Sequence, residues 1–305
     1  MKIRDALSRG SAILKAKNID TAALDASLLL AEVLAMSRAA LIAAAHDEIT
    51  AEQYAGFHTL IERRKNGECT AYILGKKEFY GLDFTVNHNV LVPRPDTEIL
   101  VETALQKLEM DTLRVLDLCT GSGAIAIALK HERPALEVWA ADISAKALEV
   151  AQTNAARLLP ENSPVHFCLG NLFEALSDKT ALQSTAPDFQ LTLNSSFHLI
   201  VSNPPYIPTN EIGSLAPEVR REPCIALDGG SDGLDIIRII VRDAPEHLHS
   251  GGTLLIEADP RQMKEIKRML EQSGFDGVQT YKDLSGQERV IGATLLQSRS
   301  SGQSF

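Results

Sequence analysis

A short run of residues in the second half of the chain combines an amide side chain, two prolines and an aromatic ring. Asn203, Pro204, Pro205 and Tyr206 follow the mainly apolar stretch 197–202. Proline has no backbone N–H to give to a sheet, so the two prolines end any strand there and hold the backbone extended. Asn203 is therefore expected at a strand tip with free polar edges, beside the flat ring of Tyr206. Such a run on its own is more often a simple strand breaker, and the rest of the chain has to decide.

A glycine-containing turn lies between a predicted strand and a predicted helix. Glycine allows a positive φ and a close approach of backbone to a ligand, and the helix N-terminus behind it offers free N–H groups. Asp142 ends the next predicted strand about 20 residues later, where a carboxylate can accept hydrogen bonds from both hydroxyls of a ribose. The residues of the turn that we expect to bind a cofactor are Cys119, Thr120, Gly121, Ser122 and Gly123.

Two features favour S-adenosylmethionine over NAD as that cofactor. Asp117 precedes the turn, where its carboxylate can neutralise an ammonium group. The last two predicted strands are joined by residues 283–287, too short a connection for a helix, so the sheet should end in an antiparallel pair. Asn171, at the tip of the third strand, is a candidate to bind the adenine edge, with Leu172 packing on the ring. An ordinary surface-loop role for Asn171 and NAD-dependent redox chemistry both stay open.

From residue 114 onward, strand patterns alternate with helical ones. This alternation predicts an α/β fold with a mostly parallel sheet covered by helices on both faces. The fold class is therefore a seven-stranded, Rossmann-like sheet with an antiparallel last strand. Residues 174–197 are polar and predict a surface insertion, and the tail 298–305 is expected to fray. The predicted strands are 114–118, 137–141, 165–169, 198–202, 253–258, 278–282 and 290–296, with helices at 123–131 and 144–158.

The first 74 residues have a helical period and predict a small bundle. Asp20 or Thr21 can cap the second helix and Ser37 the third, while Thr50 and Gln53 have the spacing of a capping box for the fourth. A hairpin-like linker over residues 75–98 follows. Nothing in the bundle has the pattern of a catalytic site, so we expect it to serve recognition or packing.

Composition and charge narrow the classes of function. The chain has 305 residues, enough for two domains with cores of their own. Its four cysteines form no Cys-x-x-Cys pair and its histidines no zinc-ligand spacing, so we predict neither disulfides nor a metal. Basic and acidic residues balance over residues 1–85, which leaves the whole formal net charge of −10 in the remainder. This negative charge argues against a protein that binds nucleic acid through its phosphate groups. The start of the chain has no cleavable apolar segment and no run spans a bilayer, so a cytoplasmic protein is expected.

Together these motifs resemble those of class I S-adenosylmethionine-dependent methyltransferases that modify amino groups. Further segments narrow the resemblance to the peptide chain release factor glutamine methyltransferase family, the HemK-type protein-(glutamine-N5) methyltransferases. The resemblance extends over residues 3–297 and includes the helical domain. It implies a substrate-docking domain at 1–74, a linker at 75–98, a methyltransferase domain at 99–297 and a disordered tail at 298–305. The narrowing segments are 78–82, 93–98, 222–223 and 226–234.

The resemblance also implies a reaction and roles for residues. The expected reaction transfers a methyl group from S-adenosylmethionine to the side-chain amide nitrogen of the glutamine in the Gly-Gly-Gln loop of release factors. The side-chain oxygen of Asn203, which also borders the cofactor, and the backbone carbonyl of Pro204 would accept hydrogen bonds from that amide. Pro205 would stiffen the motif and Tyr206 would pack on the amide plane. Glu222 is expected to contact the substrate or to close the site.

Other expectations from the resemblance are less specific, and some alternatives remain. Arg94 and Thr97 are candidates to line the cofactor pocket. Asn171 replaces a common aspartate, the insertion is longer than usual, and residues 257–259 replace a turn that more often contains glycine. An adenine-N6 or other nucleic-acid amino methyltransferase is the main alternative, because the same four-residue motif suits an exocyclic amine. A binding module that keeps the fold without catalysis is a further alternative.

Overall fold

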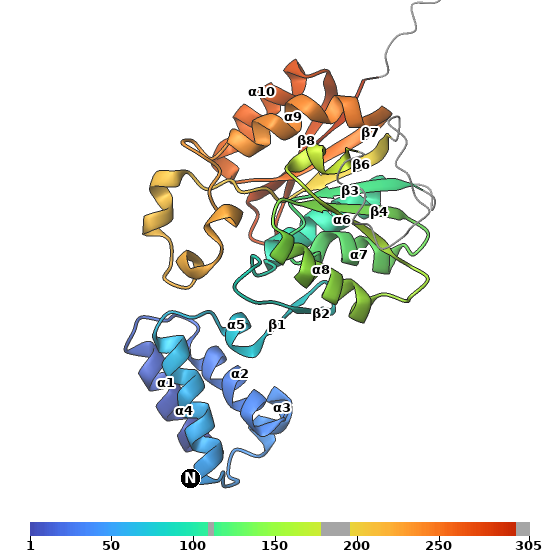
Figure 1. Ribbon diagram of the computed structural model, residues 1–305. Helices are drawn as coiled ribbons and strands as arrows, with labels where there is room; N and C mark the ends of the chain where they lie inside the picture. Colours follow the sequence, from blue (N-terminus) through green and yellow to red (C-terminus); the bar gives the residue numbers. More distant parts are fainter. Residues whose placement is uncertain (109–112, 178–195, 297–305) are drawn as a thin grey trace, which may run out of the picture. The chain divides into compact units, whose positions relative to one another are not determined.

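The computed structural model describes residues 1–108, 113–177 and 196–296. The chain divides into two compact units (Figure 1). One comprises Met1–Lys77 together with Leu215–Arg221, and the other the described residues of Glu78–Ser214 and Glu222–Phe305. Most of the predicted insertion and the whole of the predicted tail lie outside the described residues.

The first unit is a helical bundle, as predicted. The inner faces of its helices meet in a core of fully buried side chains that includes Leu14, Leu29, Leu30, Phe57 and Ile61. Burial of such apolar surface is the main stabilising term for a bundle of short helices. The helices are α1 (Ile3–Lys15), α2 (Ala22–Leu34), α3 (Arg38–Ala43), α4 (Ala51–Lys65) and α5 (Thr70–Leu74).

Two of the predicted helix caps form in this unit. The Ser37 hydroxyl accepts a hydrogen bond from the Ala40 N–H at the start of α3. Thr50 and Gln53 make both bonds of the capping box at the start of α4. The predicted side-chain cap of α2 is wrong, because the Thr21 hydroxyl donates to Asp25 at 2.8 Å instead of accepting from the helix.

A buried arginine joins the distant segment Leu215–Arg221 to the bundle. The Arg64 guanidinium, only 4% exposed, donates to Asp25 at 2.8 Å and to Glu218 at 3.0 Å. A charge in such a position has to be paired, because its desolvation is otherwise costly. No sequence pattern predicts this packing, since Asp25 and Glu218 both lie far from Arg64 along the chain.

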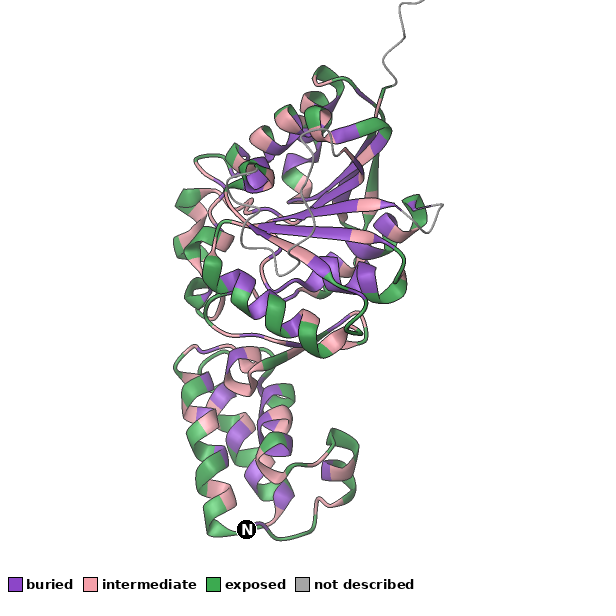
Figure 2. Ribbon diagram, turned by 45° about the vertical axis from the view of Figure 1, so that its right-hand side comes forward, coloured by how far each residue is buried: buried purple, intermediate pink, exposed green. Residues whose placement is uncertain are grey.

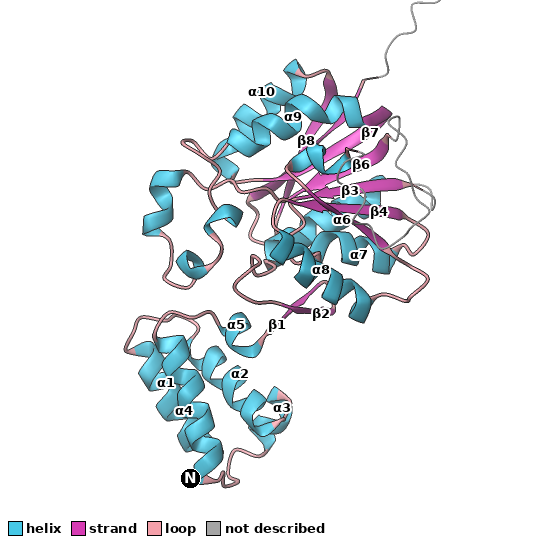
Figure 3. Ribbon diagram, in the orientation of Figure 1, coloured by secondary structure: helices cyan, strands magenta, loops and turns pink. Residues whose placement is uncertain are grey.

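The second unit is built on a seven-stranded sheet in the order β5-β4-β3-β6-β7-β9-β8. Figure 3 shows the strands of this sheet with helices around them. The pairs from β5 to β7 are parallel, and β9, inserted between β7 and β8, is antiparallel to both. The predicted α/β class with its antiparallel last strand is therefore confirmed. The strands are β3 (Arg114–Leu118), β4 (Glu137–Asp142), β5 (Val165–Leu169), β6 (Phe197–Ser202), β7 (Leu248–Glu257), β8 (Phe275–Lys282) and β9 (Glu288–Leu295).

Helices cover both faces of this sheet. α6, α7 and α8 lie on one face and α9 and α10 on the other, and buried residues concentrate between the layers (Figure 2). The parallel strands β3 and β6 are buried almost along their whole length, as expected for strands covered on both sides. The helices are α6 (Glu98–Lys107), α7 (Ala124–Glu132), α8 (Ala145–Leu158), α9 (Asp235–His247) and α10 (Met263–Gln272).

The predicted strand positions agree with the structure to within a few residues, and the largest difference is at β7. This strand begins at Leu248 instead of residue 253, and its pairing with β6 shifts register between Phe197 and Leu199. Residues 248–252 include a histidine, a serine and two glycines, so no alternation of apolar and polar residues predicted this part of the strand. In the predicted linker, β1 (Lys76–Phe79) and β2 (Leu82–Thr85) form a two-stranded sheet.

Within the described residues, no helix combines the length and apolar character required to span a membrane.

Candidate active site

A cavity of about 300 Å³ lies at the edge of the sheet where the parallel strands end. In open α/β sheets this edge is the usual place for a ligand, because the loops after the strands diverge there. The cavity has a largely apolar lining with a few polar groups, which is typical of a small-molecule site. Its lining residues are Asn89, Val90, Leu91, Cys119, Gly121, Ala141, Asp142, Ile143, Ser144, Ala147, Asn171, Leu172, Asn203, Pro205, Pro223, Ile225, Ala226 and Ile236.

The structure brings many of the predicted site residues together around this cavity and places the others behind it. The glycine turn, the second-strand acid, the third-strand tip and the proline motif all reach the lining. The predicted residues in the lining are Cys119, Gly121, Asp142, Asn171, Leu172, Asn203 and Pro205. Those that are not in the lining are Asp117, Thr120, Ser122, Gly123, Pro204, Tyr206 and Glu222.

The glycine turn has the backbone conformation for which glycine was expected. Gly121 and Gly123 have φ of +56° and +80°. A Cβ on Gly123 would lie 2.8 Å from Ile127 Cδ1 and 3.1 Å from Ala151 Cβ, so this glycine also lets α7 approach α8. A Cβ on Gly121 would meet nothing within 4 Å, because this residue faces the open cavity.

The Asp142 carboxylate is held by the backbone on both of its oxygens. Oδ2 accepts from the Gly121 N–H at 2.8 Å and Oδ1 from the Ser144 N–H at 2.9 Å. Burial raises the pKa of Asp142, and these backbone hydrogen bonds partly offset the rise. The Ile143 N–H also interacts with this carboxylate, which has about four acceptor sites in all, so capacity remains for a ligand hydroxyl.

Asp117 lies beneath the turn and is completely buried. Its Oδ2 accepts from the Thr120 hydroxyl at 2.6 Å and from the Ala126 N–H at 3.2 Å. Its Oδ1 has no hydrogen-bond partner within the described residues. Burial raises the pKa of Asp117 to about 7 although the Thr120 hydrogen bond lowers it. A half-satisfied carboxylate is costly and would be stabilised by a cation brought close by a ligand.

The tip of the third strand contributes one exposed and one buried residue. Asn171 is exposed, whereas Leu172 is 7% exposed and has a φ of +50°. A positive φ in a leucine is uncommon and turns its side chain onto the cavity wall. Ile143, next to Asp142 and 52% exposed, also lines the cavity and presents apolar surface to a flat ligand.

Asn203 follows the last residue of β6 and presents its amide to the cavity, with its side-chain nitrogen already bound. Nδ2 donates to the Thr97 hydroxyl at 3.1 Å. Thr97 belongs to the short 3-10 helix η1 (Pro95–Thr97) ahead of α6 and is 4% exposed. Neither Thr97 nor Arg94, both proposed from the sequence as cofactor-pocket residues, is part of the lining. Thr97 contacts Asn203 instead.

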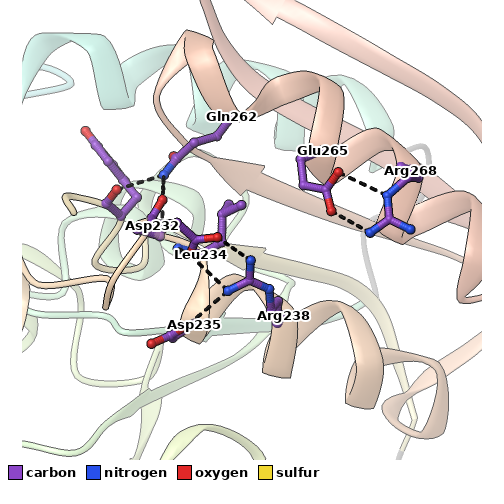
Figure 4. A network of polar contacts seen from close by, with 9 residues as sticks. Asp232, Leu234, Asp235, Arg238, Gln262, Glu265 and Arg268 are labelled. Carbon is purple, nitrogen blue, oxygen red and sulfur yellow. Dashed lines mark hydrogen bonds and ion pairs between the residues drawn. The ribbon is translucent and has the colours of Figure 1, made fainter. Parts of the chain in front are cut away.

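The far end of the proline motif is held by a glutamine from another element. Gln262 Nε2 donates to the backbone carbonyls of Tyr206 at 2.9 Å and Gly233 at 3.1 Å (Figure 4). The next residue, Ile207, exchanges backbone hydrogen bonds with Leu227 and Gly229. The predicted segment 226–234 therefore packs beside the motif. The Tyr206 ring lies against the hydrophobic core, and burial raises its pKa.

Glu222 lies away from the cavity, so a substrate contact for this residue is not supported. Its side chain is fully buried, and its carboxylate accepts from the Val92 N–H at 3.0 Å and from Arg94 at 2.5 Å. The adjacent Leu91 and Pro223 both line the cavity. Glu222 thus joins two wall segments, which is closer to the predicted site-closing role than to a substrate contact.

Sequence reasoning missed several residues of the site. The loop 89–91 and Ile225 line the cavity, although neither has a motif-like pattern. Pro223 and Ala226 also line it, and they belong to segments that narrowed the resemblance without being predicted as site residues. Asn154 of α8 is fully buried, and its amide bonds Ser122 O at 3.0 Å and both backbone groups of Thr85. A polar residue on the apolar side of a predicted amphipathic helix was the only sequence signal for Asn154.

The sheet order, the antiparallel last strand and a cavity at the strand ends define the fold of a class I methyltransferase. Residues 95–216 match the family model of the methyltransferase small domain, and residues 5–75 match that of the PrmC N-terminal domain. Among solved structures, the catalytic domain of hMettl16 in complex with MAT2A 3′UTR hairpin 6 has a TM-score of 0.54 at 13% identity, covering 79% of this chain and 83% of that one. At this identity the likeness concerns the fold alone.

Relatives of known name are much closer in sequence. The release factor glutamine methyltransferase of Geobacter sulfurreducens is 40% identical over 294 residues, 96% of each chain. That of Pseudomonas aeruginosa is 43% identical over 270 residues, covering 88% of this chain and 91% of the relative. The chain belongs to the release factor glutamine methyltransferase family, as its motifs indicated.

Proposed function

We propose that this protein transfers a methyl group from S-adenosylmethionine to the side-chain amide nitrogen of the glutamine in the Gly-Gly-Gln loop of peptide chain release factors. The observation that carries the proposal is the convergence of Asn203 and Asp142 on one cavity, in a chain that matches named release factor glutamine methyltransferases over most of its length. The adenine-N6 alternative is not favoured, because those relatives are named for glutamine in a protein.

The residues around the cavity fit S-adenosylmethionine. Asp142 keeps acceptor capacity for a ribose hydroxyl, and Ile143 and Leu172 offer apolar surface for the adenine. Asn171 lies at the same tip for the adenine edge. The unpartnered Oδ1 of buried Asp117 suits the positive field of an ammonium group. When bound, this cofactor supplies an electrophilic methyl group.

The reacting amide needs help because its nitrogen lone pair is delocalised into the carbonyl. Asn203 Oδ1 and the Pro204 carbonyl accept its two N–H groups, which polarises the nitrogen and fixes its direction. Pro205 stiffens the pair, and Tyr206, whose ring packs against the hydrophobic core, anchors the far end of the motif. As the nitrogen gains the methyl group it loses one proton to solvent. Catalysis of this kind rests on positioning and preorganised electrostatics.

The proposed division of labour follows the two units. Residues 1–74 dock the release factor body, residues 75–98 link the two parts, and residues 99–297 carry out methyl transfer. The reaction takes place in the cytoplasm with release factors as partners, without a requirement for nucleic acid. The acidic balance of the catalytic part attracts basic loops of the partner, so salt should slow their association.

Mass spectrometry of the substrate tests the function directly. The protein is incubated with isotopically labelled S-adenosylmethionine and either a purified release factor, DNA or RNA. We expect one added methyl group on the glutamine of the Gly-Gly-Gln peptide and no label in either nucleic acid. Label in nucleic acid with an unmodified release factor would overturn the proposal.

A further inference from the structure

Glu257, the last residue of β7, is a buried carboxylate beside the proposed reacting group. It is 1% exposed, and it stands one strand away from Asn203, since the preceding residues Ile256 and Ser202 are partners in register. Its carboxylate interacts with the Thr97 hydroxyl and with Asn203, and its Oε2 has no hydrogen-bond partner within the described residues. A buried charge of this kind is costly and calls for a reason.

The order of donors and acceptors in this cluster sets the direction of the Asn203 amide. A threonine hydroxyl has a single proton. When that proton goes to the Glu257 carboxylate, the Thr97 oxygen can only accept, and the group that donates to it at 3.1 Å is Asn203 Nδ2. The amide nitrogen is thereby committed to the protein, and Oδ1 is the end left for the cavity.

We propose that Glu257, acting through Thr97, fixes which end of the Asn203 amide faces the cavity and is therefore a positioning residue for methyl transfer. The inference rests on the proposed function for its catalytic consequence. An acceptor is what a substrate N–H requires. With the amide reversed, its NH₂ would face the substrate NH₂, and neither group could accept.

The protonation state of Glu257 controls the arrangement. A protonated carboxyl can donate to Thr97, whose own proton is then free to point at Asn203, which favours the reversed amide. Burial raises the pKa of Glu257 to about 7, and the Thr97 hydrogen bond lowers it. The charged groups around it are Arg289 of β9 and Asp96 of η1, which form an ion pair at 3.2 Å. Tyr206 also interacts with it, but its raised pKa keeps the phenol neutral near pH 7.

Matched substitutions at Thr97 isolate the hydroxyl. Thr97→Val keeps the shape and removes the hydrogen bonds, whereas Thr97→Ser keeps the hydroxyl. With purified release factor and S-adenosylmethionine, we expect Thr97→Val to lower kcat at least tenfold with cofactor Kd within about twofold, and Thr97→Ser to keep at least about half of the activity. Equal losses in both variants, or none in Thr97→Val, would overturn the proposal.

Glu257→Gln separates a positioning role from a purely structural one, because only the positioning role predicts a change in the pH dependence of kcat. The kcat of the parent should rise between about pH 6 and 8 as the Glu257 carboxyl loses its proton, and the variant should lose this rise. A rise of the same size in the variant would contradict the proposal.

A readout without substrate separates this inference from the proposed function. The side-chain NH₂ signals of Asn203 in a ¹⁵N–¹H spectrum, assigned by their loss in Asn203→Ala, should move with pH in the parent and stay fixed in Glu257→Gln. If the parent methylates no release factor yet these signals move as expected, the function is wrong and the positioning role stands. If the parent is active and the signals behave alike in both proteins, the positioning role is wrong.

Discussion

The two ends of the cavity are built by different means. At the end proposed for the cofactor, the Asp142 carboxylate binds backbone N–H groups of Gly121 and Ser144 directly. At the reacting end, Asn203 is held by a relay of side chains through Thr97 to Glu257. The first arrangement depends on the glycine turn and on Asp142, about 20 residues later in the chain, and backbone hydrogen bonds maintain it. The second depends on residues that meet only in the folded sheet, so single substitutions can disable it without loss of the fold.

Asn203→Ala should have the largest effect of the substitutions at the two ends. Removal of one preorganised polar contact to the reacting group costs about 10²–10³-fold in turnover. Because Asn203 lies at the reacting end, cofactor binding should stay nearly unchanged. Single-turnover methylation of a release factor and calorimetric titration with S-adenosylmethionine measure the two effects. A variant as active as the parent would remove Asn203 from the mechanism.

Glu257→Gln should change how stability depends on pH. A carboxyl whose pKa is raised in the folded state holds its proton more tightly there than in the unfolded chain. The free energy of unfolding is therefore highest below the ordinary glutamate value of 4.5 and falls as pH rises to about 7. At about 1.4 kcal/mol per pH unit, the fall from this one group is at most about 3.5 kcal/mol.

Urea unfolding at pH 5 and pH 8 measures this difference. Asp117 contributes a fall of the same sign, because burial also raises its pKa to about 7, and that contribution should survive in Glu257→Gln. The variant should thus lose less stability than the parent between the two pH values. An identical loss in both proteins would show that Glu257 does not titrate in this range.

Asp142→Ala should weaken the cofactor end without touching the reacting end. The substitution strands the Gly121 and Ser144 N–H groups and removes the acceptor for the ribose, which costs about 1–3 kcal/mol of binding free energy. Calorimetric titration with S-adenosylmethionine reports the change in Kd, and kcat at saturating cofactor should recover much of the parent value. An unchanged Kd would contradict the proposed role of Asp142.

The features that could be predicted from the sequence are those that depend on local backbone rules, and most of them lie at the cofactor end. The glycine turn, Asp142 and the strand before Asn203 were predictable because each depends on local backbone rules. Glu257 and Gln262 were not, because a single buried polar residue at the end of a strand or helix has no pattern until the sheet order is known. The contacts of Glu222 were not predictable either, since its partners Val92 and Arg94 lie about 130 residues earlier in the chain.

Two single variants, Gly121→Ala and Gly123→Ala, test the backbone conformation at the cofactor end, where we expect the smallest effect. Both residues have positive φ, which costs an alanine about 1–2 kcal/mol. At Gly121 the new methyl group meets no protein atom within 4 Å, so the free energy of unfolding should fall by about that amount and no more. Gly123→Ala should lose more, because its Cβ would lie 2.8 Å from Ile127. In urea unfolding, Gly123→Ala should therefore have the lower free energy of unfolding.

Cofactor titration tests the same two variants for binding. Gly121→Ala should lose more cofactor affinity than Gly123→Ala, because its methyl group would point into the space proposed for the cofactor. Equal cofactor affinity of Gly121→Ala and the parent would place the cofactor away from the turn.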